Sequence, residues 1–396
     1  MGTENRPFRI LILDLVGLKF DANGQPDHSE VKAHIESKGG VFHIGPWDGS
    51  NQLAADKLHF FYQPDLSTAS EILSLTDQGQ YDAVIAAATF IPKETVFKSG
   101  GVRIGAGTGN MGAASWGGGS GVGGEAPLMN TPGFNSRATA QMVFKALLRA
   151  RPNLPVDELH ARVLAGAFDT GQNLREYPTE KLEGKKFAVI GYGNIGREVA
   201  LIARAFGMRI SVYARPKHRA AIEKDGFEFA SSVIEAARGA DVLSVHTGLG
   251  AFEAATGRFA NAGLIDSAVM SAMNLDAVLI NYDRGEVVDA VALERALSSG
   301  QIGCAAIDAD IFVDEASKVI SGPLVPYLDI AKRHQGKLLL TPHAAADTDH
   351  PSRVAGAKQA VDQIFDCILL KRVTNLKGDL PPDFTSAGFK NGTVAD

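Results

Sequence analysis

Residues 185–215, which read KKFAVIGYGNIGREVALIARAFGMRISVYAR, constrain the fold more than any other stretch of this chain. Phe187–Ile190 is a short apolar run with the length of a buried strand, and the glycine-rich segment Gly191–Gly196 follows it directly. Apolar residues then recur at helical spacing as far as Gly207, and Arg209–Tyr213 alternates like a second strand. We therefore predict a strand–turn–helix–strand unit, which is the context that a GxGxxG motif requires.

The three glycines of this motif have separate tasks in a dinucleotide-binding unit. Gly191 permits the tight turn, Gly193 lets the backbone approach a pyrophosphate, and Gly196 lets the helix pack on the strand. The helix that begins near Asn194 and Ile195 presents unpaired N–H groups and partial positive charge to phosphate. We therefore predict that these five residues bind a dinucleotide, and the alternative is a flexible glycine loop.

The end of the second strand bears on the choice of dinucleotide. An acidic side chain there would bind the ribose hydroxyls of NAD. Residues 214–219 read ARPKHR, which contains no acid and four basic or potentially basic groups. Because guanidinium groups pair well with phosphate, we predict NADP with Arg215 at its 2′-phosphate. NAD and a merely solvated basic turn are the alternatives.

Composition and charge narrow the class of protein. The chain has 396 residues, with hydrophobic and charged fractions of 45% and 21%, which fits an ordinary globular protein of two domains. A net charge of −6 argues against a general binder of nucleic acid or acidic membranes. No apolar run spans a bilayer, and the two cysteines, Cys304 and Cys367, cannot form a disulfide framework. We expect a cytoplasmic protein with no nucleic-acid or membrane partner.

Strand-like and helix-like segments alternate along most of the chain. The clearest strand patterns lie at residues 8–15, 82–87, 102–106, 241–246, 276–281, 302–307 and 337–340. This alternation predicts an α/β fold with doubly wound parallel sheets. The helical pattern of residues 351–370 follows the last strand, and its apolar face needs a partner. We therefore expect that helix to return to the first domain.

Two stretches lack a regular hydrophobic pattern. Gly117–Gly124 carries no apolar period, which predicts a mobile surface loop. The residues after Leu376 are polar and contain several glycines and prolines, which predicts a loose tail.

Polar residues follow three of the predicted strands, at the edge where open α/β sheets bind ligands. They are Arg284, the acidic stretch that contains Asp308, Asp310 and Glu315, and His343 after Pro342. Each alone has an ordinary interpretation as a surface cation, a solvated acidic loop or a structural histidine. Together they supply an anchor for a carboxylate, a proton donor and a group that tunes the donor, as reduction of a 2-keto acid requires.

Several segments of the chain resemble motifs of a known family. GYGNIG, INYDRGEVVD, AAIDADIFVDE, LLTPHAA and MNTPGFN are similar to motifs of the D-isomer-specific 2-hydroxyacid dehydrogenases, a family that includes D-3-phosphoglycerate dehydrogenase and glyoxylate/hydroxypyruvate reductase. The resemblance runs from about Phe8 to about Leu370. It implies two Rossmann-like domains. Residues 1–132, completed by 347–396, would form a flavodoxin-like substrate-binding (catalytic) domain, and residues 133–346 the NAD(P)-binding domain.

The resemblance also implies catalytic roles. Arg284 would hold the substrate carboxylate and the reacting oxygen, and His343 would be the general acid in reduction and the general base in oxidation. Glu315 would hydrogen-bond His343 and raise its pKa. Glu315 comes two residues later than the family spacing, so that without a small insertion Asp310 or Asp314 would be the partner.

The binding residues follow in the same way. The resemblance places Asp308 at the nicotinamide carboxamide and the neighbourhoods of Thr247 and Tyr282 along the cofactor. The backbone around Thr108 and Gly109 would bind the substrate carboxylate. No metal is implied. Asp283 beside the arginine departs from the family pattern, and could attract a substrate cation or face away.

The implied reaction is hydride transfer between nicotinamide and a small 2-keto or D-2-hydroxy acid, with glyoxylate, hydroxypyruvate and phosphohydroxypyruvate as candidates. A homodimer is expected because the family commonly pairs through a helical arm on the dinucleotide domain. Two alternatives stay open. One is a dinucleotide-sensing binding protein of the C-terminal-binding corepressor type, and the other is a phosphite- or formate-type dehydrogenase, although Glu315 argues against formate.

Overall fold

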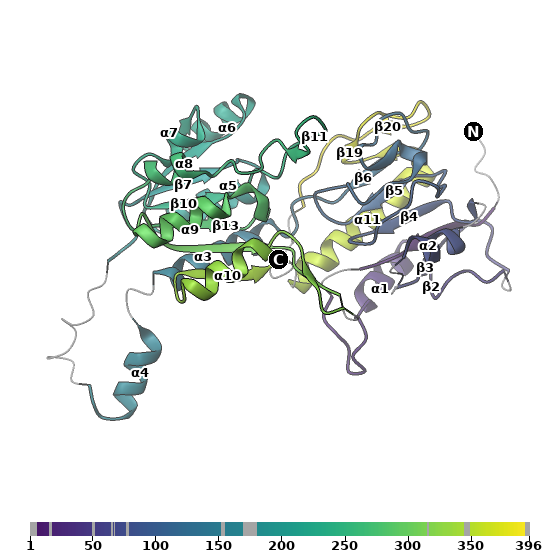
Figure 1. Ribbon diagram of the computed structural model, residues 1–396. Coiled ribbons are helices and arrows are strands. Elements are labelled where there is room, and N and C mark those ends of the chain that lie inside the picture. Colours follow the sequence, from purple (N-terminus) through teal and green to yellow (C-terminus); the bar gives the residue numbers. More distant parts are fainter. Residues whose placement is uncertain are drawn as a thin grey trace. The chain divides into compact units, whose positions relative to one another are not determined.

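The chain divides into two compact units, each with its own sheet and its own core. Unit 1 comprises Met1–Asn135 and Asp347–Asp396, and unit 2 comprises Ser136–Ala346. The computed structural model describes residues 6–392 apart from residues 16–17, 50–51, 65, 67, 77–78, 152–154, 169–179, 315–316 and 344–348. Figure 1 labels the elements of both units.

Unit 1 is built on a seven-stranded sheet. Its strands are β1 (Phe8–Ile12), β2 (Val41–Ile44), β3 (Leu58–Tyr62), β4 (Ala83–Ala86), β5 (Gly101–Arg103), β6 (Leu128–Asn130) and β19 (Leu376–Lys377). Their order is β19-β6-β5-β4-β1-β3-β2, and every neighbouring pair is parallel except β19 with β6. Without the two outermost strands the order is that of flavodoxin, 2-1-3-4-5.

The last long helix of the chain packs on this sheet. The helices of unit 1 are α1 (Ser29–Ser37), α2 (Ala69–Thr76) and α11 (His350–Leu370), with short 3₁₀ turns η2 (Ala114–Trp116) and η3 (Gly118–Ser120). Val361 and Ile364 of α11 are fully covered in one cluster with Ile10 and Val102 of the strands. Burial of such side chains is worth about 1.5–3 kcal/mol each. The expectation that this helix completes the first unit is thus confirmed.

As far as residue 392, the tail after Leu376 is ordered, which corrects the prediction of a loose end. Besides β19, it contains β20 (Thr385–Ser386), which pairs with β18 (Arg372–Val373). The backbone N–H of Lys390 donates to Asn375 Oδ1 at 2.6 Å, and that of Gly392 donates to the carbonyl of Pro132 at 2.8 Å. These contacts involve backbone groups, so they require no periodic apolar side chains that the sequence would reveal.

The glycine-rich segment is also held in place, so the prediction of a mobile loop is wrong. The N–H of Asp379 donates to the carbonyl of Gly121 at 3.0 Å, and the N–H of Gly123 donates to Asp379 Oδ2 at 3.1 Å. A Cβ at Gly121 would lie 2.0 Å from the carbonyl oxygen of Lys377. The glycines therefore serve a close backbone approach between this segment and the tail.

Unit 2 is built on a second seven-stranded sheet, in which all neighbouring strands are parallel. Its strands are β7 (Lys186–Ile190), β8 (Arg209–Tyr213), β9 (Glu228–Ala230), β10 (Val242–Val245), β13 (Ala277–Asn281), β14 (Ile302–Ala309) and β17 (Leu338–Pro342). The order β17-β14-β13-β10-β7-β8-β9 reverses direction between β7 and β10. That is the Rossmann order, with its ligand crevice at the reversal.

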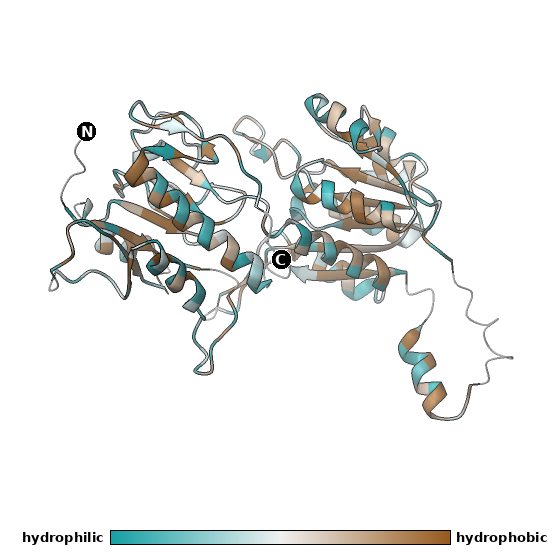
Figure 2. Cartoon of the chain, turned by 180° about the vertical axis from the view of Figure 1, so that it is seen from behind, coloured by the Kyte–Doolittle hydropathy of each residue, from teal (hydrophilic) through white to brown (hydrophobic). Residues whose placement is uncertain are grey.

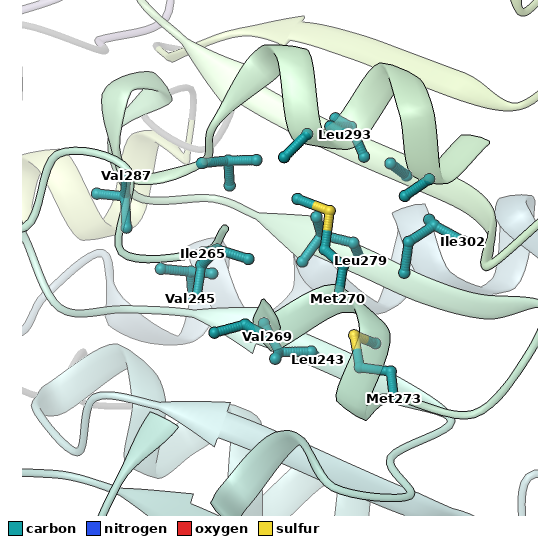
Figure 3. Close-up of a cluster of buried hydrophobic side chains, with 14 of the residues drawn as sticks. Leu243, Val245, Ile265, Val269, Met270, Met273, Leu279, Val287, Leu293 and Ile302 are labelled. Carbon is teal, nitrogen blue, oxygen red and sulfur yellow. The ribbon is translucent and has the colours of Figure 1, made fainter. Parts of the chain in front are cut away.

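Helices cover both faces of this sheet. They are α3 (Ser136–Ala150), α5 (Asn194–Ala205), α6 (Arg219–Lys224), α7 (Val233–Ala237), α8 (Ser267–Ala272), α9 (Ala290–Ser299) and α10 (Val325–Arg333), whereas α4 (Val156–Leu164) buries none of its residues. One core layer lies under α3 and α5, and the other under α7 to α10. In the second layer, Leu243 and Leu279 of the strands lie beside Met270 of α8 and Leu293 of α9 (Figure 3). The strands of both sheets are accordingly hydrophobic in Figure 2.

Two short hairpins interrupt the loops at the carboxyl edge of this sheet. β11 (Phe252–Glu253) pairs with β12 (Arg258–Phe259), and β15 (Phe312–Val313) pairs with β16 (Ile320–Ser321). The first hairpin follows β10, and the second lies between β14 and α10.

Neither a membrane span nor a metal cluster is found in the part of the chain that the structure describes. No helix among those residues is long and apolar enough to cross a membrane. Nor do three or more His, Cys, Asp or Glu side chains gather there in an arrangement that could hold a metal ion. The cytoplasmic location stays a prediction.

Candidate active site

Five parallel strands of unit 2 end at residues that the sequence singled out. Gly191 follows β7, Thr247 comes shortly after β10, Arg284 follows β13, Asp308 lies near the end of β14, and His343 follows β17. Because parallel strands present their carboxyl ends at one edge of a sheet, these residues share that edge.

The turn after β7 has the geometry that a dinucleotide needs. Gly191 has φ +104°, and a Cβ there would lie 2.2 Å from the carbonyl oxygen of His246. A Cβ at Gly196 would lie 2.1 Å from the carbonyl oxygen of Gly191, so that only glycine lets α5 approach the turn. At Gly193 a Cβ would meet no atom within 4 Å, and this residue caps α5 without a side chain. The open backbone at Gly193 and the helix N–H groups after it fit a pyrophosphate.

Basic side chains surround the end of β8. Arg215 and Lys217 are exposed, and their charges, together with burial as the larger cause, lower the pKa of His218. Arg219 is engaged elsewhere, because it forms an ion pair with Glu223 at 2.8 Å. Ala214, where an acid would meet the ribose of NAD, is buried. Arg215 and Lys217 therefore provide positive charge, and among the described residues neither forms an ion pair with a carboxylate.

The backbone that carries Arg284 is fixed by two buried side chains that the sequence did not reveal. Asn281 donates from Nδ2 to the carbonyl of Arg284 at 2.8 Å, and its Oδ1 accepts from the N–H of Asp283 at 3.2 Å. From α10, the hydroxyl of Tyr327 donates to the carbonyl of Gly285 at 2.7 Å. These bonds shape the turn after β13 and present the guanidinium of Arg284 beyond it.

Asp283 faces the neighbouring strand end rather than a free cation. Its Oδ2 accepts a short hydrogen bond from the N–H of Gly248, next to Thr247. Burial raises the pKa of Asp283, against this hydrogen bond. Tyr282 is buried, and its hydroxyl oxygen lies 3.4 Å from Thr341 Oγ1. Asp283 thus fastens the loop after β10 to the turn that holds Arg284.

His343 is held through both ring nitrogens. Its Nδ1 lies 3.0 Å from Asp308 Oδ1, and its Nε2 lies 3.0 Å from Arg284 Nη1. Asp308 is almost fully buried and also accepts from Thr341 Oγ1 at 2.8 Å. The hydrogen bond to Asp308 raises the pKa of His343, although burial and the charge of Arg284 act in the opposite direction. The described contacts therefore make Asp308 the carboxylate partner of this imidazole.

Three other carboxylates are candidate partners of His343, namely those of Asp310, Asp314 and Glu315. Glu315 lies outside the described residues, so its pairing with His343 stays a prediction. Asp310 Oδ2 lies 3.8 Å from Arg284 Nη1, which makes it a neighbour of the guanidinium. Asp314 accepts from the N–H of Ser317 at 2.6 Å within its own hairpin.

A pocket of about 310 Å³ opens where these groups meet. It is lined by Leu249, Asp283, Arg284, Gly285, Glu286, Ala309, Asp310, Pro323 and His343. Its volume lies at the lower end of the range that small-molecule sites occupy. The side chains of Arg284 and His343 are partly exposed, so that both can reach a molecule in the pocket.

The predicted carboxylate-binding backbone at Thr108 and Gly109 belongs to unit 1. The hydroxyl of Thr108 donates to the carbonyl of Gly119 at 2.5 Å, which ties this turn to the glycine-rich segment. A Cβ at Gly109 would meet no atom within 4 Å, so the backbone there is open to a ligand.

Comparison with known proteins places the chain in a family. The family model described as D-isomer specific 2-hydroxyacid dehydrogenase, NAD binding domain, matches residues 153–345. A glyoxylate reductase of Aeropyrum pernix is 30% identical over 260 residues, which cover 65% of this chain and 69% of that protein. A D-3-phosphoglycerate dehydrogenase of Methanocaldococcus jannaschii is 28% identical over 251 residues, or 63% of this chain and 43% of that protein.

Solved structures agree on the fold. The NAD⁺-bound 3-phosphoglycerate dehydrogenase of Entamoeba histolytica has a TM-score of 0.63 at 18% identity, covering 94% of this chain and 99% of that one. An acyclic imino acid reductase in complex with NADPH and D-Arg has a TM-score of 0.60 at 19% identity, covering 93% and 99%. Because the glyoxylate reductase is 30% identical over more than two thirds of its length, the chain belongs to the D-isomer specific 2-hydroxyacid dehydrogenase family and is an oxidoreductase that depends on a nicotinamide cofactor.

Proposed function

We propose that this enzyme reduces a small 2-keto acid to the D-2-hydroxy acid, with Arg284 and His343 at the reacting carbonyl. The observation that carries the proposal is the chain of contacts from Asp308 through His343 to Arg284 at the rim of one pocket. Glyoxylate, hydroxypyruvate and phosphohydroxypyruvate are the candidate substrates, and the first two are small enough to need little more than these groups.

The contacts among Asp308, His343 and Arg284 suggest which group donates each hydrogen bond to the substrate and which transfers the proton. When His343 is neutral, its Nδ1–H donates to Asp308 and its Nε2 accepts from Arg284. When His343 is protonated, Nε2 becomes a donor, so that it and Arg284 both need an acceptor. A keto oxygen between them would accept both bonds and then take the proton from Nε2. Bound nicotinamide supplies the hydride to the keto carbon.

The carboxylate of the substrate requires a cation and backbone donors. Arg284 is the only arginine or lysine among the described residues that line the pocket, and its guanidinium can fork onto a carboxylate. We propose that the backbone at Thr108 and Gly109 of unit 1 supplies further donors. In this proposal unit 1 is the substrate-binding (catalytic) domain and unit 2 the dinucleotide-binding domain.

For the cofactor we propose NADP, held by the turn from Gly191 to Gly196 and by Arg215. The support is the open backbone at Gly193 and the basic end of β8, where Ala214 replaces an acid. Thr247 and Tyr282 would line the nicotinamide side. NAD remains the alternative dinucleotide.

We further propose a homodimer that pairs through α4. No residue of this helix is buried, and its apolar residues Val156, Val163 and Leu164 are exposed. An amphipathic helix with an uncovered apolar side needs a partner surface. Sedimentation equilibrium of the purified chain should give twice the monomer mass, and a monomer at micromolar concentration would refute this arrangement.

The direct test of the activity is the initial rate of NADPH and NADH oxidation with the three candidate acids. Turnover with NADPH would support both the reaction and the role of Arg215. Turnover with NADH alone would support the proposed reaction but contradict the proposal that Arg215 binds the 2′-phosphate of NADP. Dinucleotide binding without turnover of any acid would contradict the proposal.

A further inference from the structure

The charges around the pocket are unbalanced. Three acidic residues line it, Asp283, Glu286 and Asp310, against the basic residues Arg284 and His343. The surplus of acid therefore bears on which keto acid the pocket accepts, a question that rests on the function proposed above.

Three of these five groups already have a task. Asp283 accepts from the N–H of Gly248, Arg284 is the anchor for the carboxylate at C1 of the substrate, and His343 is bound to Asp308. The other lining residues are Leu249, Gly285, Ala309 and Pro323, and none of them carries a charge. Among the described residues that line the pocket, no lysine or second arginine is left to neutralise another anion.

Among the described residues, Asp310 is the acid that forms an ion pair with Arg284, the proposed carboxylate anchor. Its side chain is 42% exposed, and its Oδ2 lies 3.8 Å from Arg284 Nη1. Its backbone is fixed, because the carbonyl of Asp310 accepts from the N–H of Leu324 at 3.1 Å. Gly322, with φ +109°, closes the same turn, and a Cβ there would lie 2.7 Å from that carbonyl oxygen. The carboxylate is thus held beside Arg284 from the base of the β15–β16 hairpin.

We propose that Asp310 selects substrates by the charge of the group beyond the keto carbon. A second anion, such as a phosphate or a distal carboxylate, would approach the Asp310 carboxylate and be repelled. A hydroxyl or a cationic end would instead donate a hydrogen bond to it. The enzyme therefore prefers hydroxypyruvate, or a keto acid with a positively charged side chain, to phosphohydroxypyruvate.

The test compares kcat/KM for hydroxypyruvate and phosphohydroxypyruvate, which differ only in the phosphate, with glyoxylate as a reference that lacks any group at that position. 5-Guanidino-2-oxopentanoate supplies the cationic case. In the wild-type enzyme we expect phosphohydroxypyruvate to be at least about tenfold poorer than hydroxypyruvate. In Asp310→Asn, which keeps the shape and removes the charge, that ratio should move toward unity by about tenfold. The ratio cancels any loss of turnover that the two substrates share.

Asp329→Asn is the matched control, since Asp329 is an exposed carboxylate of α10 that pairs with Lys332 and does not line the pocket. Its substrate ratio should equal that of the wild type. Equal rates for the two acids in the wild type, or an unchanged ratio in Asp310→Asn, would overturn the role of Asp310 while glyoxylate turnover upheld the reductase. Absence of turnover with every acid would overturn both.

Discussion

At the scale of single residues, the site depends on how one imidazole is held. His343 lies between a buried carboxylate and a guanidinium, each 3.0 Å from a ring nitrogen. Asp308 fixes the tautomer because a carboxylate can only accept the Nδ1 proton. The same contact raises the pKa of His343, which keeps it protonated closer to neutral pH. If His343 is the general acid, as we propose, its pKa is set by Asp308, a neighbour that need not touch the substrate.

Removal of the imidazole tests its part in proton transfer. His343→Ala should lower kcat for keto-acid reduction by about 10²–10⁴-fold, the usual contribution of a positioned acid. Dinucleotide affinity should change little. His334→Ala, at the end of α10, is the control and should keep wild-type turnover. Near-normal turnover of the His343 variant would remove this residue from the mechanism.

The pH dependence tests the link between Asp308 and His343. In reduction the protonated imidazole is active, so kcat/KM should be high at low pH and fall as pH rises through the pKa of His343. Because Asp308 raises that pKa, Asp308→Asn should move the fall to lower pH. A profile that does not move, measured with the same keto acid, would mean that another group such as Glu315 sets the pKa.

We expect the preference for NADPH over NADH to depend on Arg215. Arg215→Ala should raise KM for NADPH roughly 10–100-fold, as loss of a charge-assisted hydrogen bond of about 1.5–3 kcal/mol implies. KM for NADH should stay nearly constant. Arg219→Ala is the matched control, since Arg219 already pairs with Glu223. Equal shifts for the two dinucleotides in Arg215→Ala would count against NADP.

Sequence reasoning could name Arg284 and His343 because both follow strand ends in recognisable motifs. It could not foresee that Asp283 binds the backbone of Gly248, or that Asp308 reaches Nδ1 of His343. Each of those contacts joins two strand ends that are 35 residues apart in the chain. Which acid points at which strand end depends on side-chain direction, and a single sequence does not carry that information.

At the scale of elements, the turn from β7 into α5 contains one glycine that we expect to serve ligand binding and another that serves folding. Gly193 and Gly196 lie three positions apart, yet a Cβ would meet nothing at the first and a carbonyl oxygen at 2.1 Å at the second. The first glycine leaves room outside the protein for a ligand. The second lets the helix approach the strand, so their substitution should have different consequences.

The pair Gly193→Ala and Gly196→Ala provides the measurement. Gly193→Ala should leave the thermal midpoint near that of the wild type while weakening dinucleotide binding, as seen by calorimetry. Gly196→Ala should destabilise the fold by about 1–3 kcal/mol, the usual cost of overpacking. The reverse pattern, with an unstable Gly193 variant that binds normally, would contradict this assignment.

The sequence predicts helices and strands whose apolar residues recur at regular spacing, but it does not predict ordered segments that lack such spacing. The strands and long helices carry apolar residues at regular spacing, as at Val361 and Ile364 of α11. The glycine-rich segment and the tail hold each other through backbone bonds such as that from Asp379 to Gly121. Backbone bonds leave no side-chain signature, so the sequence suggested loose segments where the structure has ordered ones.

At the scale of the whole molecule, two α/β units with different strand orders share one chain. The Rossmann order of unit 2 gathers Gly191, Thr247, Arg284, Asp308 and His343 at one sheet edge. The alternation of strands and helices predicts this class of fold, and the motifs identify the dinucleotide unit. The return of α11 to unit 1 follows from its apolar face. The identity of the substrate does not follow, because it depends on side chains that only the folded pocket assembles.

The most direct test of the account is the fate of the hydride. Hydroxypyruvate should be reduced with nicotinamide cofactor deuterated on either face of C4, and the glycerate analysed by mass spectrometry and chiral chromatography. We expect D-glycerate with deuterium at C2 from one of the two labelled cofactors, because in the proposed reaction the hydride passes to the keto carbon while His343 supplies the proton to oxygen. L-glycerate, or product that lacks deuterium at C2 with both cofactors, would contradict it.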